Sequence, residues 1–265
     1  MMNIFRTKTI LGLTCALLLA AQPVSSTLAA GVEANVMALN PGDTIPLTII
    51  PKGVYLRASN DPAGAIWDRV PEYQVQLLPA PPVHASVQLR QDGDNTPMPL
   101  YFSVVSDRER LYIKLRWVDG SENTLTRADK FRDGTAVQFA LNGGAATSFI
   151  MGSSDMPVNI WYWKSDEDSV QNLAAGGFGS TTLLPQQPVS ASSLYTPARL
   201  PEDSQWTVVM SRPLNAEGEY MATFEAGTVQ PLSFAVWQGA DKQRDGHKRV
   251  TMGWVNVDLK PLLDS

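Results

Sequence analysis

The feature that most constrains the fold of this chain is an alternation of apolar and polar residues. Apolar side chains occupy every second position from Leu111 to Trp117, and the same pattern runs from Val83 to Leu89. A period of two is typical of a β-strand with one buried face, because successive side chains point to opposite sides of a sheet. We therefore predict a strand over each segment, with His84 on the polar, solvated face of the earlier one.

Further strand candidates are separated by turn signals rich in Asp, Asn and Gly. They cover residues 73–77, 99–105, 136–141, 206–212, 232–237 and 250–259. No long segment shows a helical period. Many strands joined by frequent turns predict an all-β chain, folded as an antiparallel β-sandwich with long loops. Residues 164–204 are the exception, because they are first acidic and then rich in Gly, Ser, Gln and Pro, which predicts a long loop.

The first thirty residues have the layout of a secretory signal peptide. Arg6 and Lys8 precede an apolar run from Ile10 to Ala21, and small residues at Ala29 and Ala30 follow it. Twelve apolar residues are too few for a membrane span, which needs about 20. We predict that residues 1–30 are removed, and that residues 31–265 form a single domain of a periplasmic protein.

Cysteine and charge exclude several kinds of function. The only cysteine, Cys15, lies in the predicted signal peptide. The mature chain then has no disulfide, no thiolate-bound iron–sulfur cluster, no covalent haem attachment and no cysteine nucleophile. The net charge of −5 becomes −7 when Arg6 and Lys8 are removed. An acidic chain without a basic stripe is a poor ligand for nucleic acid and suits a basic soluble partner.

Enzyme and metal motifs are poorly represented. There is no G-x-S-x-G nucleophile motif, no glycine loop that would cradle a phosphate, and no pair of histidines at metal-ligand spacing. The acidic run at 166–168 is typical of a solvated loop.

Two stretches combine apolar rings with possible ligands. In the first, Met151-Gly152 precedes the aromatic run from Val158 to Trp163. In the second, a charged loop at 240–246 follows Trp237 and leads to His247 and Lys248. A thioether beside flat rings suits a large planar cofactor, and it also suits an ordinary core.

The order and spacing of these motifs resemble a known family. The motifs are LYIKLRWVD at 111–119, KFRDGTAVQF at 130–139, PVNIWYW at 157–163, FAVWQG at 234–239 and GHK at 246–248. They are similar to those of the haem-binding gamma subunits of periplasmic molybdenum enzymes of the dimethyl-sulfoxide-reductase superfamily. That group includes dimethylsulfide dehydrogenase, ethylbenzene dehydrogenase, chlorate reductase and selenate reductase.

The resemblance implies one b-type haem, bound without covalent attachment, with Met151 and Lys248 as the axial ligands of its iron. Met156, in the same stretch, is an alternative ligand to Met151, and His247, which precedes Lys248, is an alternative to Lys248. Adjacent strand residues point to opposite faces, so only one of His247 and Lys248 can reach the iron.

Lysine can bind iron only as the neutral amine, which lies roughly 5 kcal/mol above the ammonium form at pH 7. We expect burial in an apolar pocket, lined by residues such as Trp161, Trp163 or Trp237, to supply part of that energy.

The resemblance also implies partners. An iron–sulfur beta subunit, a molybdenum-containing alpha subunit and this chain would form a heterotrimer, and a soluble c-type cytochrome would exchange electrons with it. The chain would then be a non-catalytic electron-transfer subunit. An exported carbohydrate-binding-like β-sandwich module without haem is the alternative, because exposed Trp and Tyr side chains can stack on sugars. An exported scaffold without a cofactor is a further one.

Overall fold

The structure is a computed structural model that describes residues 36–51, 60–89 and 94–263. The predicted signal peptide, residues 1–30, lies outside the described residues. In the part described, the strands are β1 (Val36–Ala38), β2 (Thr44–Pro46), β3 (Thr48–Ile49), β4 (Glu72–Pro79), β5 (Met98–Ser106), β6 (Arg110–Val118), β7 (Gly134–Ala140), β8 (Val158–Lys164), β9 (Ser169–Ala175), β10 (Thr182–Leu183), β11 (Ser190–Thr196), β12 (Gln205–Pro213), β13 (Val229–Trp237), β14 (Arg249–Thr251) and β15 (Val255–Asp258). The helical elements are η2 (Trp67–Arg69), α1 (Ala85–Gln88), η3 (Pro201–Asp203) and η4 (Lys260–Leu262).

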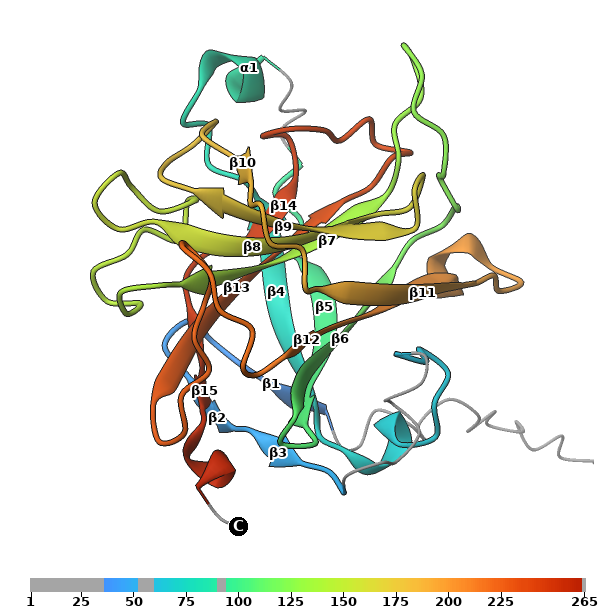
Figure 1. The fold of residues 1–265 in the computed structure, drawn as a ribbon. Coiled ribbons are helices and arrows are strands. Elements are labelled where there is room, and N and C mark those ends of the chain that lie inside the picture. The colour runs from blue at the N-terminus through green and yellow to red at the C-terminus, as the bar shows by residue number, and fades with distance from the viewer. Residues whose placement is uncertain (1–35, 52–59, 90–93, 264–265) are drawn as a thin grey trace, which may run out of the picture. The chain divides into compact units, whose positions relative to one another are not determined.

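The strands form one hydrogen-bonded sheet with the order β10-β9-β8-β7-β13-β14-β4-β5-β6-β12-β11 (Figure 1). All pairs along this path are antiparallel, which confirms the predicted all-β class. The short strands β1, β2 and β3 add parallel pairs beside it.

Side chains from the two halves of the sheet pack against each other, as in a β-sandwich. The ring centroids of Phe102 on β5 and Phe234 on β13 lie 4.7 Å apart. Trp117 on β6 contacts Trp163 on β8, with centroids 6.4 Å apart. The apolar set of β6 that the sequence predicts, from Leu111 to Trp117, is fully buried in this core.

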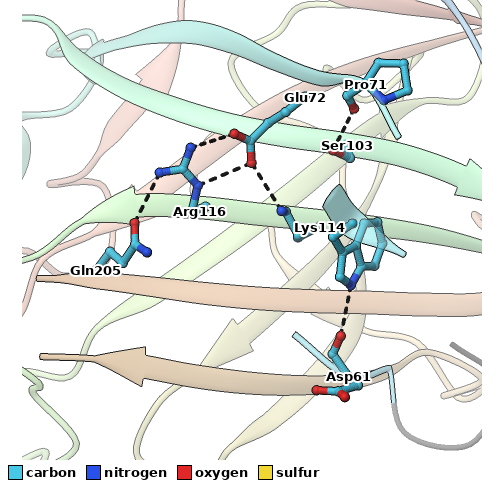
Figure 2. Close-up of polar contacts among 8 residues, drawn as sticks. Asp61, Pro71, Glu72, Ser103, Lys114, Arg116 and Gln205 are labelled. Carbon is cyan, nitrogen blue, oxygen red and sulfur yellow. Dashed lines mark hydrogen bonds and ion pairs between the residues drawn. The ribbon is translucent and has the colours of Figure 1, made fainter. Parts of the chain in front are cut away.

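The polar face of β6 is covered as well, and Figure 2 shows how. Glu72 forms ion pairs with Lys114, at 3.2 Å, and with Arg116, at 2.6 Å. The Trp67 ring lies 5.5 Å from the Lys114 ammonium, and its indole N–H donates to the Asp61 carbonyl. Because the segment from Asp61 to Glu72 lies over this face, β6 is buried on both sides.

The prediction of a strand over Val83–Leu89 is wrong. Residues 85–88 form the short helix α1, which follows Pro81 and Pro82. Val87 is buried, but Val83 and Leu89 are exposed by 49% and 86%. The alternation in this segment therefore reflects a single buried contact rather than the buried face of a strand.

The prediction of one long loop over 164–204 is also wrong, because β9, β10 and β11 lie there. β11 is at the end of the sheet and alternates Ser with small or apolar residues, so its composition resembles a loop. The predicted strand over 250–259 is interrupted instead. Trp254 separates β14 from β15, and its indole N–H donates to the Thr147 carbonyl at 2.8 Å.

Candidate functional site

A cavity of about 690 Å³ lies on the face of β7, β8, β9 and β13 that points away from the main core. This volume is within the usual range of small-molecule and cofactor sites. Its floor is made of small side chains: Ala136 on β7 pairs in register with Ala235 on β13. Ile160 and Tyr162 on β8 and Leu173 on β9 form the adjoining wall. Small residues opposite one another leave the space that larger side chains would fill.

Met151 enters the cavity from the loop between β7 and β8. It has a φ of 60°, a left-handed conformation that non-glycine residues rarely adopt. Gly152 follows with a φ of 69°, and a β-carbon there would lie 2.5 Å from the Met156 carbonyl oxygen. The Gly177 N–H donates to the Met151 carbonyl at 2.8 Å, which ties this turn to the loop after β9. The Met-Gly pair is therefore a fixed turn that presents a thioether.

Lys248 enters the cavity from the opposite direction, immediately before β14. Its carbonyl accepts from the Ala80 N–H at 2.8 Å, and its ammonium lies 4.7 Å from the centroid of the Trp237 ring. Burial lowers the pKa of Lys248 from 10.5 to about 8, while the nearby Asp245 carboxylate acts in the opposite direction. Deprotonation of Lys248 to the neutral amine therefore costs less free energy than deprotonation of an exposed lysine.

The loop before Lys248 is packed tightly against the loop after β9. A β-carbon at Gly246 would lie 2.5 Å from the Phe178 ring and 2.7 Å from the Val87 side chain. Phe178 in turn stacks with the His84 ring, at a centroid distance of 5.9 Å. His84 is exposed, as predicted, but it lies beside α1 at the cavity wall. A glycine at 246 is what lets these three segments meet.

The structure brings the two predicted ligands together. The Lys248 Nζ and the Met151 Sδ are 4.0 Å apart, although 97 residues separate them in the sequence. A thioether sulfur and a neutral amine nitrogen are both metal donors, and here they lie within reach of each other at the wall of the cavity. The donor pair and the cavity therefore fit a metal ion held within a flat ligand.

Met156 and His247, the alternative ligands in the same two stretches, are placed differently. The residues that line the cavity include Met151 and Lys248 but neither Met156 nor His247. The His247 N–H donates to the Arg244 carbonyl within its own loop. Across the described residues, no group of three or more His, Cys, Asp or Glu side chains could hold a metal ion.

The expected tryptophan lining is only partly correct. Trp237 lines the cavity, but Trp161 and Trp163 are fully buried in the main core on the other face of β8. Successive strand residues point to opposite faces, so Ile160 and Tyr162 take the cavity side instead. The register of PVNIWYW could have indicated this, once Trp161 was assigned to the core.

Polar groups gather where β7 begins. Arg132 and Tyr162 both line the cavity, and the Arg132 guanidinium pairs with Asp166 at 2.6 Å. Burial raises the pKa of Tyr162, while the neighbouring Arg132 lowers it. Asp166 also accepts from the Thr126 hydroxyl. The acidic run at 166–168, predicted to be a solvated loop, therefore contributes one carboxylate to a partly buried ion pair.

The ethylbenzene dehydrogenase family model matches residues 64–187 and 177–249 of this chain. The chain belongs to the ethylbenzene dehydrogenase family. The matched residues include both Met151 and Lys248. The resemblance that the motif order predicts is thereby confirmed.

Individual relatives agree with this assignment. The chain is 46% identical to the dimethylsulfide dehydrogenase subunit gamma of Rhodovulum sulfidophilum, over 86% of this chain and 85% of that one. It is 37% identical to the chlorate reductase subunit gamma of Ideonella dechloratans, over 73% and 77%. It is 35% identical to a Haloferax mediterranei protein named "Putative respiratory nitrate reductase heme subunit ORF7", over 76% and 68%. This member of the ethylbenzene dehydrogenase family is thus similar to gamma subunits over most of its length.

Among solved structures, the chain overlaps a carbohydrate binding module of family 9 from Caldicellulosiruptor kristjanssonii. The TM-score is 0.43 and the sequence identity is 13%, over 82% of this chain and 96% of that one. No helix among the described residues is long and apolar enough to cross a membrane.

Proposed function

We propose that this chain is the electron-transfer subunit of a periplasmic molybdenum oxidoreductase and carries one b-type haem. The observation that carries the proposal is the 4.0 Å separation of the Lys248 Nζ and the Met151 Sδ beside a cavity of about 690 Å³. Membership of the ethylbenzene dehydrogenase family and similarity to named gamma subunits support it.

Met151 and Lys248 would hold the haem iron, and the apolar cavity would hold its ring. A bound haem supplies a one-electron iron couple. The Met151 thioether is a soft, neutral donor that favours the ferrous state. Lys248 must donate as the neutral amine, and burial favours that form by lowering its pKa to about 8. Because two side chains of the chain itself, Met151 and Lys248, would hold the iron, a substrate would not need to bind there, which fits electron transfer rather than catalysis.

The chain itself would therefore transfer electrons without transforming the substrate. We propose that it joins an iron–sulfur beta subunit and a molybdenum-containing alpha subunit in a heterotrimer, and that a soluble c-type cytochrome exchanges electrons with it. The names of the relatives support a multisubunit oxidoreductase. The predicted signal peptide supports a periplasmic location, and the acidic charge suits a basic carrier.

A visible absorption spectrum of the native complex, with its subunit and haem content, tests the proposal. We expect one haem for each copy of this chain, with the sharp reduced bands of a low-spin, six-coordinate iron. The pyridine adduct should be that of a non-covalent b-type haem. A colourless chain purified with its partners would contradict the proposal and favour the carbohydrate-binding alternative.

A further inference from the structure

The cavity has one cationic group that ligation of a metal does not use. Among the described residues that line it, the Lys and Arg side chains are Lys248 and Arg132. Lys248 must be neutral to bind iron, as proposed above. The remaining wall is mostly apolar or uncharged, and its acidic residue is Asp245. A ligand that carries carboxylates therefore finds a single permanent positive charge, the Arg132 guanidinium.

Arg132 is held in a defined place. Its neighbour Asp133 is fully buried and accepts from the Gly239 N–H at 2.8 Å and from the Trp206 indole N–H at 2.9 Å. The Arg132 Nη1 pairs with Asp166 at 2.6 Å, and the side chain remains 28% exposed. Arg132 also hydrogen-bonds Tyr162, and a guanidinium has five N–H donors, so these two partners leave donors for another ligand. A guanidinium fixed on one side by a carboxylate can bind a second anion with little loss of side-chain entropy.

The strand register makes this end of the cavity polar. Tyr162 on β8 pairs with Gln171 on β9, and both line the cavity. Two residues further along, Ile160 pairs with Leu173, and there the wall is apolar. Arg132, which precedes β7, lies beside Tyr162. An amphipathic ligand would accordingly have its polar edge at Arg132, Tyr162 and Gln171, and its apolar body along Ile160 and Leu173.

We propose that Arg132 binds a carboxylate of the porphyrin, and so sets which edge of the ring lies at the polar end of the cavity. This inference rests on the proposed function, since a b-type haem carries two propionate side chains on one edge. A charge-assisted hydrogen bond from a guanidinium to a carboxylate is directional and stronger than one between neutral groups. Arg132 is thus a binding residue for the cofactor rather than an axial ligand.

The experiment compares two probes with the same ring, one with free carboxylates and one with both carboxylates esterified. The full chain is depleted of bound haem by an excess of apomyoglobin and is then titrated with iron protoporphyrin IX or with its dimethyl ester. We expect the wild type to bind the diacid roughly 10- to 100-fold more tightly than the ester, the range for hydrogen bonds to charged groups. In Arg132→Gln this preference should largely disappear, and in Arg132→Lys part of it should remain.

Arg127→Gln is the matched control, because Arg127 is exposed and does not line the cavity. It should keep the wild-type preference. The ratio of the two affinities is measured within each variant, so a general loss of stability does not imitate the effect. The inference is overturned if the wild type does not prefer the diacid, or if Arg132→Gln prefers it as strongly as the wild type does. In either case a low-spin spectrum would still support the proposed function. Failure of both porphyrins to bind the wild type overturns both.

Discussion

The two faces of strand β8 differ in how densely their side chains are packed. On one face, Trp161 and Trp163 are fully buried, and their rings lie 4.6 Å from Phe139 and 5.1 Å from Trp206, between centroids. On the other face, Ile160 and Tyr162 border a cavity of about 690 Å³. The same backbone therefore supports a close-packed core and an open site.

The difference arises from residue size rather than from hydrophobicity. On β7, Val137 and Phe139 face the core, whereas Ala136 and Ala140 belong to the cluster around the cavity. On β13, Val236 faces the core and Ala235 lies at the cavity. Protein interiors pack densely, so the small side chains of Ala136 and Ala235, paired across β7 and β13, leave room for a ligand. We infer that one face stabilises the fold and that the other is shaped for a cofactor.

The largest effect should come from breaking the packed face. Trp161→Ala should lower the free energy of unfolding of the ligand-free chain by about 3–5 kcal/mol, the usual cost of truncating a buried aromatic residue. Ile160→Ala, one residue away, should cost about 2 kcal/mol, the low end for a buried aliphatic residue, because the side chain borders the cavity. Urea unfolding measures both. Equal losses would mean that the two faces do not differ in packing.

A smaller effect is expected at the turn that presents Met151. Gly152→Ala introduces a β-carbon 2.5 Å from a backbone oxygen and also strains a positive φ. Gly143 has a φ of 86°, and a β-carbon there would have no atom within 4 Å. Gly143→Ala therefore introduces the backbone strain without a steric clash. We expect about 1 kcal/mol of destabilisation for Gly143→Ala and at least about 1 kcal/mol more for Gly152→Ala. Thermal unfolding of both variants tests this, and similar melting temperatures would argue against a tightly fixed turn.

Filling the cavity should affect binding more than stability. Ala136→Leu places three additional carbon atoms into open space, so the free energy of unfolding should change by less than about 1 kcal/mol. Haem affinity should fall about tenfold or more, because the new side chain occupies the volume that the ring needs. Haem titration and urea unfolding of the same variant separate the two outcomes. Unchanged haem affinity would place the cofactor elsewhere.

A further effect should appear as a pH dependence of stability at Lys248. Its folded pKa of about 8 lies below the ordinary 10.5, so between these values the unfolded chain binds more protons. The stability of the ligand-free chain should therefore rise with pH across that window, and burial of the charged form should cost most below pH 8. The rise should be absent in Lys248→Met. If the free energy of unfolding changed with pH in the same way in both proteins, burial of the Lys248 ammonium would not contribute to that change.

Much of the fold could be predicted from the sequence because long strands carry a strong periodic signal. Residues 111–117 alternate regularly and form most of β6. The segment Val83–Leu89 alternates over the same number of residues, yet it contains α1. It follows two prolines, and of its four alternating apolar residues only Val87 is buried. β11 was missed because this Ser-rich edge strand packs only Ala191 and Tyr195 against the core, which is a weak periodic signal.

The candidate ligands could be named from motif order, but the cavity could not. A cavity depends on which small residues stand opposite one another, and that requires the pairing of β7 with β13. Assigning Trp161 and Trp163 to the pocket failed for the same reason, since the sequence alone does not tell which face of β8 is the core. Arg132 was not singled out, because its value lies in its position beside Tyr162 and Asp166.

The most direct test of the central claim compares the haem of four variants of the native complex. Met151→Ala and Lys248→Ala each remove a proposed ligand, whereas Met156→Ala and His247→Ala alter neighbours that do not line the cavity. We expect the first two to lose haem or become high-spin, and the latter two to retain the low-spin spectrum of the wild type. A low-spin spectrum in both Met151→Ala and Lys248→Ala would contradict the claim that these two side chains meet across the haem iron.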